Sequence, residues 1–137
     1  MPKATILIVE DEAIIAEDLA QKLGRLGYEV CAITALGEEA VVLARDRRPD
    51  IVLMDICLRG RMGGVEAAEI IRRERDLLVI YLTGQADSAT LQQAKVTERS
   101  GYILKPFEEL ELETHIDMAL HKHQTESKLR QNRAVGD

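Results

Sequence analysis

Residues that could do chemistry follow directly on short apolar runs at four places in this chain. They are Glu10 and Asp11 after "ILIV" (6–9), Asp55 after "IVLM" (51–54), Thr83 after "VIYL" (79–82) and Lys105 after "YIL" (102–104). If these positions meet, their carboxylates cannot all stay ionised a few ångströms apart without a cation. Oxygen ligands and retained waters suit a hard divalent ion, and Mg²⁺ fits best.

The remaining two groups suit an anion that lies against such a metal. A lysine and a hydroxyl both donate hydrogen bonds, and a phosphoryl group is the obvious acceptor for them. One carboxylate is then free to act as a nucleophile and to form an aspartyl phosphate. The cluster therefore predicts a site at which the protein itself is phosphorylated.

The apolar runs are the elements that must position these residues. A fifth run, "VCAI" (30–33), is followed by no charged residue. All five are nearly continuous in apolar residues, which is typical of strands buried on both faces of a parallel sheet. The stretches between them have helical periodicity. Five helices are predicted. The first has an apolar face made by Ile15, Leu19, Leu23 and Leu26 and stops at Gly27, and the second spans Gly37 to Arg48 before Pro49. The third has Val65, Ala68 and Ile71 on one face, the fourth spans about Ser88 to Glu98, and the fifth has Leu112, Ile116, Ala119 and His123 on one face.

Five alternations of strand and helix predict an α/β fold. We expect a flavodoxin-like, doubly wound, five-stranded parallel sheet of order 2-1-3-4-5, with five helices in a three-layer sandwich. This order makes strands 1, 3, 4 and 5 neighbours and brings their carboxyl ends to one crevice, where such sheets bind ligands. The predicted domain spans residues 1–123, and the polar residues 124–137 are expected to be a helical extension or a linker.

Composition and charge narrow the class of protein. The 137 residues are 46% hydrophobic, enough for one core without a disulfide framework or a structural metal. The net charge is −6, which argues against nucleic acid or an anionic membrane as a direct partner. It is the sum of −8 over residues 1–120 (14 basic minus 22 acidic) and +2 over residues 121–137 (4 basic minus 2 acidic). Two separate cysteines and the lack of a signal or membrane-spanning segment predict a cytoplasmic protein.

Four motifs in order, "ILIVEDE", "IVLMDI", "YLTG" and "YILKPF", carry a family resemblance. Over roughly residues 3 to 123 the chain resembles the receiver domain of two-component response regulators. The resemblance implies a protein that takes a phosphoryl group from a histidine kinase or phosphotransfer protein. It then switches conformation to control an output domain or partner.

The resemblance also implies roles for individual residues. Asp55 would be the phosphoacceptor, while Asp11, Glu10 and the backbone carbonyl of Cys57 would ligate Mg²⁺ together with it. Thr83 would donate to the phosphoryl oxygens and Lys105 would pair with them. Tyr102 would change rotamer on activation, and the Lys105–Pro106 bond would be cis. A homodimer through the fourth helix, fifth strand and fifth helix is a further expectation.

The loop after Asp55, residues 56–64, departs from the family pattern. It lacks the usual proline, is one residue longer, and places Arg59 and Arg61 beside the pocket. Glu10 also stands where Asp is commoner, although a longer carboxylate can still reach the ion. We expect Cys57, despite its position, to be an inert buried thiol.

Other interpretations stay open at this point. Taken singly, Asp11 or Asp55 could merely cap a loop or a helix, Thr83 could be a turn hydroxyl, and Tyr102 a core ring. An Mg²⁺-dependent phosphatase is an alternative, but such enzymes typically place the nucleophile on the first strand. Another alternative is a receiver that works by binding alone, without phosphorylation. The presence of Asp55, Thr83 and Lys105 argues against it. Whether slow self-dephosphorylation makes the chain an enzyme is left open.

Overall fold

A single five-stranded parallel sheet organises the chain, and the computed structural model describes residues 2–84 and 101–136. The strands are β1 (Thr5–Val9), β2 (Glu29–Thr34), β3 (Ile51–Asp55), β4 (Leu78–Thr83) and β5 (Gly101–Leu104). Their order is β2-β1-β3-β4-β5, and every neighbouring pair is parallel. This confirms the predicted sheet, its order and the five apolar runs as strands.

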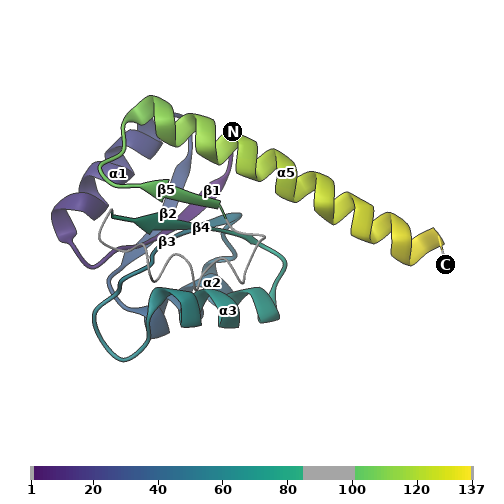
Figure 1. Ribbon diagram of the computed structural model, residues 1–137, viewed down its shortest axis with the longest axis horizontal. Helices are drawn as coiled ribbons and strands as arrows, with labels where there is room; N and C mark the ends of the chain where they lie inside the picture. The colour runs from purple at the N-terminus through teal and green to yellow at the C-terminus, as the bar shows by residue number, and fades with distance from the viewer. Residues whose placement is uncertain (1, 85–100, 137) are drawn as a thin grey trace.

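The described residues contain four helices, which cover the two faces of the sheet. They are α1 (Ala13–Arg25), α2 (Gly37–Arg47), α3 (Gly64–Glu74) and α5 (Glu109–Gly136). In Figure 1, α1 and α5 lie on one face of the sheet and α2 and α3 on the other. The helix that we predicted from about Ser88 to Glu98 lies outside the described residues, so four of the five predicted helices are observed.

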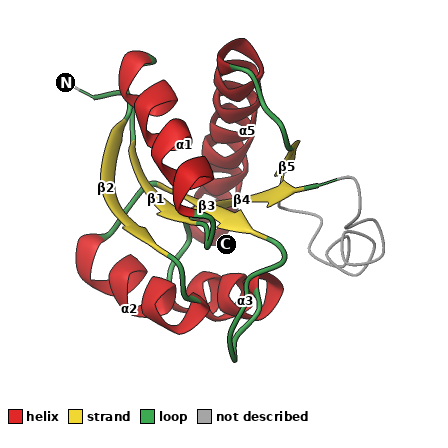
Figure 2. Ribbon diagram, turned by 90° about the vertical axis from the view of Figure 1, so that its left-hand side faces the viewer, coloured by secondary structure: helices red, strands yellow, loops and turns green. Residues whose placement is uncertain are grey.

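Alternating side chains of each strand divide between two apolar layers. On β1, Ile6 and Ile8 pack towards α1 and α5, whereas Leu7 and Val9 pack towards α2 and α3. All four are fully buried. Because consecutive strand residues point to opposite faces, a strand covered on both sides must be apolar at every position. The nearly continuous apolar runs of the sequence are therefore the signature of this three-layer arrangement, which Figure 2 shows in cross-view.

Helix α1 ends where the sequence predicts. Gly27 follows the helix with a φ of 96°, a left-handed conformation that glycine adopts without strain. The backbone N–H of Tyr28 then donates to the carbonyl of Leu23, so a hydrogen bond from the segment after the helix caps its last turn. This turn leads directly into β2.

Helix α5 is longer than the predicted domain needs. Its buried residues Leu112 and Ile116 pack against the sheet, and the helix continues through the polar stretch to Gly136. Two side chains beyond the apolar part contact Asp76, which lies between α3 and β4. The Ser127 hydroxyl donates to its Oδ2 at 2.8 Å, and His123 Nε2 lies 3.5 Å from its Oδ1. Within the described part of the chain, none of the helices combines the length and apolar character that a bilayer crossing needs.

The loop from β3 to α3 returns closely beneath the end of β3. A Cβ added at Gly64 would lie 2.1 Å from the backbone oxygen of Asp55, and one added at Gly37 would lie 2.7 Å from the backbone oxygen of Met62. Side chains do not tolerate such distances, so glycine is needed at both points of close approach. The loop is thereby held against the start of α2 and against the end of β3.

Candidate functional site

Three carboxylates from two neighbouring strands meet at the carboxyl edge of the sheet. Glu10 and Asp11 follow β1, and Asp55 is the last residue of β3, which pairs with β1 in register. One carboxylate oxygen from each of the three lies within 4.8 Å of the other two. Glu10 and Asp55 are only 2% and 4% exposed, so the cluster is withdrawn from bulk water. The structure therefore brings these predicted residues together.

Lys105 reaches the same cluster from the end of β5. Its Nζ lies 2.7 Å from Glu10 Oε1 and 3.5 Å from Asp55 Oδ2. Its backbone N–H donates to the carbonyl of Thr83 at 2.7 Å, which ties it to the end of β4. The Lys105–Pro106 peptide bond that follows is cis, as the family resemblance implied. Lys105 thus lies between two carboxylates that would otherwise repel each other.

Thr83 completes the row of strand ends. It is the last residue of β4, which lies between β3 and β5, and it is fully buried. Its hydroxyl donates to the carbonyl of Gly84 at 3.2 Å. The hydroxyl is therefore positioned at the same edge of the sheet as Asp55 and Lys105.

The electrostatics of the cluster show an excess of negative charge. Burial raises the pKa of Glu10 to about 7, with Lys105 acting in the opposite direction and Asp55 adding to the rise. Burial alone would lower the pKa of Lys105, but its contacts with Glu10 and Asp55 outweigh this and raise the pKa. A proton on Glu10 is thus held more tightly than in water, mainly because burial disfavours the charged carboxylate and also because Asp55 lies beside it.

The loop after β3 supplies further contacts to the acids. The backbone N–H of Cys57 donates to Asp55 Oδ1 at 3.0 Å, and that of Arg59 donates to Asp11 Oδ2 at 3.1 Å. The guanidinium Nε of Arg59 lies 3.5 Å from the same Asp11 oxygen. The pattern of residues placed Arg59 beside the pocket but did not identify Asp11 as its partner. No sequence periodicity relates a loop residue to a strand end 48 positions away.

The expectation of a buried Cys57 thiol is wrong. The residue is exposed, because it lies in the loop beyond the last residue of β3 and not in the strand itself. Its backbone amide faces the site through Asp55, while its side chain is accessible to solvent.

The donor set fits a hard divalent cation. Three carboxylates offer oxygen ligands within a few ångströms, which is the chemistry that Mg²⁺ prefers. The raised pKa of Glu10 indicates a site that gains from added positive charge. Among the described residues, this is the one group of three or more acidic, histidine or cysteine side chains close enough to hold a metal.

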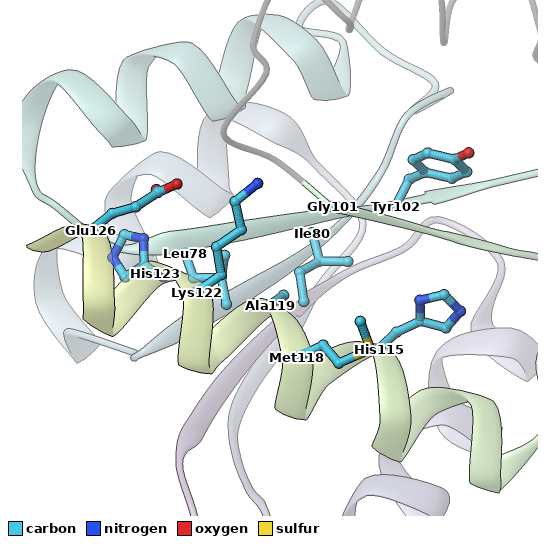
Figure 3. A pocket seen from close by; sticks show the side chains of 10 residues that line it. All are labelled: Leu78, Ile80, Gly101, Tyr102, His115, Met118, Ala119, Lys122, His123 and Glu126. Atoms are coloured by element: carbon cyan, nitrogen blue, oxygen red, sulfur yellow. The ribbon is translucent and has the colours of Figure 1, made fainter.

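Tyr102 borders a hollow of about 340 Å³ whose lining includes none of the three acids (Figure 3). This hollow is bordered by Leu78 and Ile80 of β4 and by residues of α5 such as Met118 and Lys122. Tyr102 is 49% exposed, so it is not a ring of the buried core, which was the alternative interpretation of this residue. It instead forms part of a surface made by β5 and α5.

Comparisons with known proteins agree with this geometry. Residues 6–117 match the family model described as the response regulator receiver domain. The transcriptional regulatory protein PdtaR of Mycobacterium tuberculosis is 35% identical over 117 residues, which are 85% of this chain and 57% of that protein. The DNA-binding response regulator MtrA of Mycobacterium leprae is 31% identical over 88% of this chain and 53% of its own length. The chain therefore spans little more than half the length of these curated relatives.

Solved structures share the fold at similar identity. The signal receiver domain of a modulated diguanylate cyclase from Desulfovibrio desulfuricans is 40% identical, with a TM-score of 0.83 over 90% of this chain and 98% of that one. The N-terminal domain of a response regulator, sensory box and GGDEF protein from Carboxydothermus hydrogenoformans is 34% identical, with a TM-score of 0.81 over 90% of this chain and 98% of that one. The strand order, the motifs and the extent of these matches lead to one conclusion: the chain belongs to the family of response regulator receiver domains.

Proposed function

We propose that this receiver accepts a phosphoryl group on Asp55 and relays the change to an output domain or partner. The observation that carries this proposal is the buried Asp55 carboxylate, which shares one small site with Glu10, Asp11 and Lys105. The Asp55 carboxylate repels the neighbouring carboxylates of Glu10 and Asp11 unless further positive charge enters the site. A partner histidine kinase or phosphotransfer protein would donate the group from a phosphohistidine in the cytoplasm, and acetyl phosphate could replace it in vitro.

The metal ligands in this proposal are Glu10, Asp11 and Asp55, with the backbone carbonyl of Cys57 as a further ligand. Glu10 would act directly or through a water molecule. When bound, Mg²⁺ supplies positive charge that offsets the acids and the incoming phosphoryl oxygens. Lys105, already between Glu10 and Asp55, provides the second positive charge.

The transfer step needs little from the protein beyond position and charge. A carboxylate oxygen of Asp55 attacks phosphorus, the new oxygen–phosphorus bond forms, and the bond from phosphorus to the donor imidazole nitrogen breaks. The electron pair of that bond leaves with the imidazole. Lys105 and the Thr83 hydroxyl then donate to the phosphoryl oxygens, which requires the hydroxyl to leave its present acceptor on Gly84.

The product adds a charge of about −2 at the end of β3. Movement of Thr83 and Lys105 towards this charge would shift an existing equilibrium, in which Tyr102 changes rotamer. The surface read by a partner would be the face made by the predicted fourth helix, β5 and α5. A homodimer could form through this face, and α5 leads from it towards an output domain.

The decisive test is intact mass after incubation with Mg²⁺ and acetyl phosphate. We expect the parent chain to gain one phosphoryl group and Asp55→Ala to gain none. Asp50→Ala is the matched control, because Asp50 stands at the opposite end of the same strand and should leave the gain intact. An unchanged mass for the parent chain would refute the proposal, and turnover of many phosphate esters per protein would favour a phosphatase.

A further inference from the structure

The three acids of the site do not share their positive partners equally. Lys105 contacts Glu10 and Asp55, and its side chain is 19% exposed. Asp11 has a different partner, Arg59, whose side chain is 83% exposed. One cation is therefore built into the interior of the site, while the other approaches from solvent on a loop.

Arg59 contacts Asp11 in two separable ways. Its backbone N–H donates to Oδ2 at 3.1 Å, and its guanidinium Nε lies 3.5 Å from the same oxygen. Gly60 follows with a φ of 103°, so the chain turns away immediately after this contact. The backbone bond belongs to the path of the loop and does not depend on the side chain. The guanidinium contact belongs to the side chain alone and can be removed by substitution.

The guanidinium contact has the properties of an exchangeable interaction. An ion pair whose cation is mostly in water is worth little, because solvent screens it and the long side chain loses freedom in making it. The carboxylate that it contacts, that of Asp11, also supplies one of the three ligand oxygens that lie within 4.8 Å of one another. Arg59 and a divalent cation therefore compete for one carboxylate.

We infer that Arg59 is an exchangeable counter-cation of the metal site. Before metal binds, its guanidinium neutralises Asp11, and a divalent cation must displace it to use that carboxylate. This inference rests on the proposed function, because it requires that Asp11 ligate the metal. Arg59 thereby sets the concentration of Mg²⁺ at which the receiver becomes competent for phosphoryl transfer.

Two physical effects act in the same direction on this affinity. Removing the guanidinium removes the competitor for Asp11, and it also removes a positive charge that repels the incoming cation. The backbone hydrogen bond from residue 59 survives substitution by alanine. Arg59→Ala should therefore bind Mg²⁺ more tightly, by about two- to fivefold at low ionic strength.

Arg61 provides a matched control in the same loop. It carries the same charge two residues further on and is also exposed. Arg61→Ala changes the net charge as Arg59→Ala does, but it leaves the guanidinium at Asp11 in place. If the specific pair is responsible, Arg61→Ala should change the affinity by much less than Arg59→Ala.

Isothermal titration of the parent chain and both variants with MgCl₂, without any phosphoryl donor, tests the inference. We expect Arg59→Ala to bind Mg²⁺ more tightly than both the parent chain and Arg61→Ala, with the difference shrinking at high salt as an ion pair requires. An equal or weaker affinity in Arg59→Ala overturns the inference, and so does an equal gain in Arg61→Ala. If the parent binds Mg²⁺ and only these differences fail, the proposed function stands. If the parent binds no Mg²⁺, the inference and the proposed metal dependence fall together.

Discussion

Strand β3 has an aspartate at each end, and the two have opposite surroundings. Asp50 immediately precedes the strand and is exposed; its Oδ2 accepts the backbone N–H of Thr5 at 2.8 Å. Asp55 ends the strand and is 4% exposed, with two other carboxylates beside it. The same side chain, five residues apart, thus closes a backbone contact at one edge of the sheet and enters an acidic cluster at the other.

The difference shows that residue type alone does not separate a structural acid from a reactive one. At the amino edge, Asp50 receives a hydrogen bond and remains hydrated, so its charge costs little. At the carboxyl edge, β1, β4 and β5 each add a polar side chain next to Asp55, and burial raises the cost of every negative charge. The position along a parallel strand determines which of these environments an acid meets.

Crowding the backbone of Asp55 is expected to have the largest effect on the difference between the two ends of β3. Gly64→Ala would place a Cβ 2.1 Å from the Asp55 carbonyl oxygen, so the loop or the strand end must move. We expect a loss of about 3 kcal/mol in the free energy of unfolding. Chemical denaturation measures it, with Gly63→Ala as the control, since a Cβ there meets nothing within 4 Å. Similar losses in both variants would contradict the close approach.

The acidic cluster should also make stability depend on pH. The pKa of Glu10 is raised from 4.5 to about 7 in the folded protein, so the folded state holds this proton where the unfolded state has lost it. The associated stability is fully present below about pH 4.5 and is lost as the pH rises through about 7, a change of about 3 kcal/mol.

Denaturation in chelator at pH 5 and pH 8 measures this difference. Glu10→Gln should remove most of it, whereas Glu12→Gln, at the exposed neighbour on the N-terminal side of α1, should retain it. If Glu10→Gln kept the full difference, the charge of Glu10 would not be its source.

The two aspartates themselves should respond in opposite directions. Asp50→Ala removes the acceptor of the Thr5 N–H and should lower the free energy of unfolding by about 1 kcal/mol. Asp55→Asn removes one of three crowded charges and should raise it by up to about 1 kcal/mol in chelator, since function and stability conflict at such sites. Thermal unfolding with and without Mg²⁺ checks both; a less stable Asp55→Asn protein in chelator would be inconsistent with the crowding described here.

Much of this arrangement could be predicted from the sequence because it depends on periodicity and topology. Continuous apolar runs identify the strands, and the order of a doubly wound sheet then brings Glu10, Asp11, Asp55, Thr83 and Lys105 to one edge. The closer contact of Lys105 with Glu10 than with Asp55 could not be predicted, because it depends on how the lysine crosses β4.

The loops and the final helix were harder to predict. The pairing of Arg59 with Asp11 and the exposure of Cys57 depend on the path of a loop, which has no periodicity. The sequence also did not predict whether α5 continues to Gly136. The second half of this helix is polar and has no apolar periodicity, although it is helical. In that half, contacts of Ser127 and His123 with Asp76 accompany the helix where apolar packing ends.

The length of α5 has a mechanical consequence. Its 28 residues form a rod of about 42 Å at 1.5 Å per residue, seated at one end against the sheet. A tilt of about 5° at the seated end would sweep the free end through roughly 4 Å, given that length. In Figure 1 the far part of the helix projects beyond the sheet, so small adjustments beside β5 are converted into larger displacements outside the sandwich.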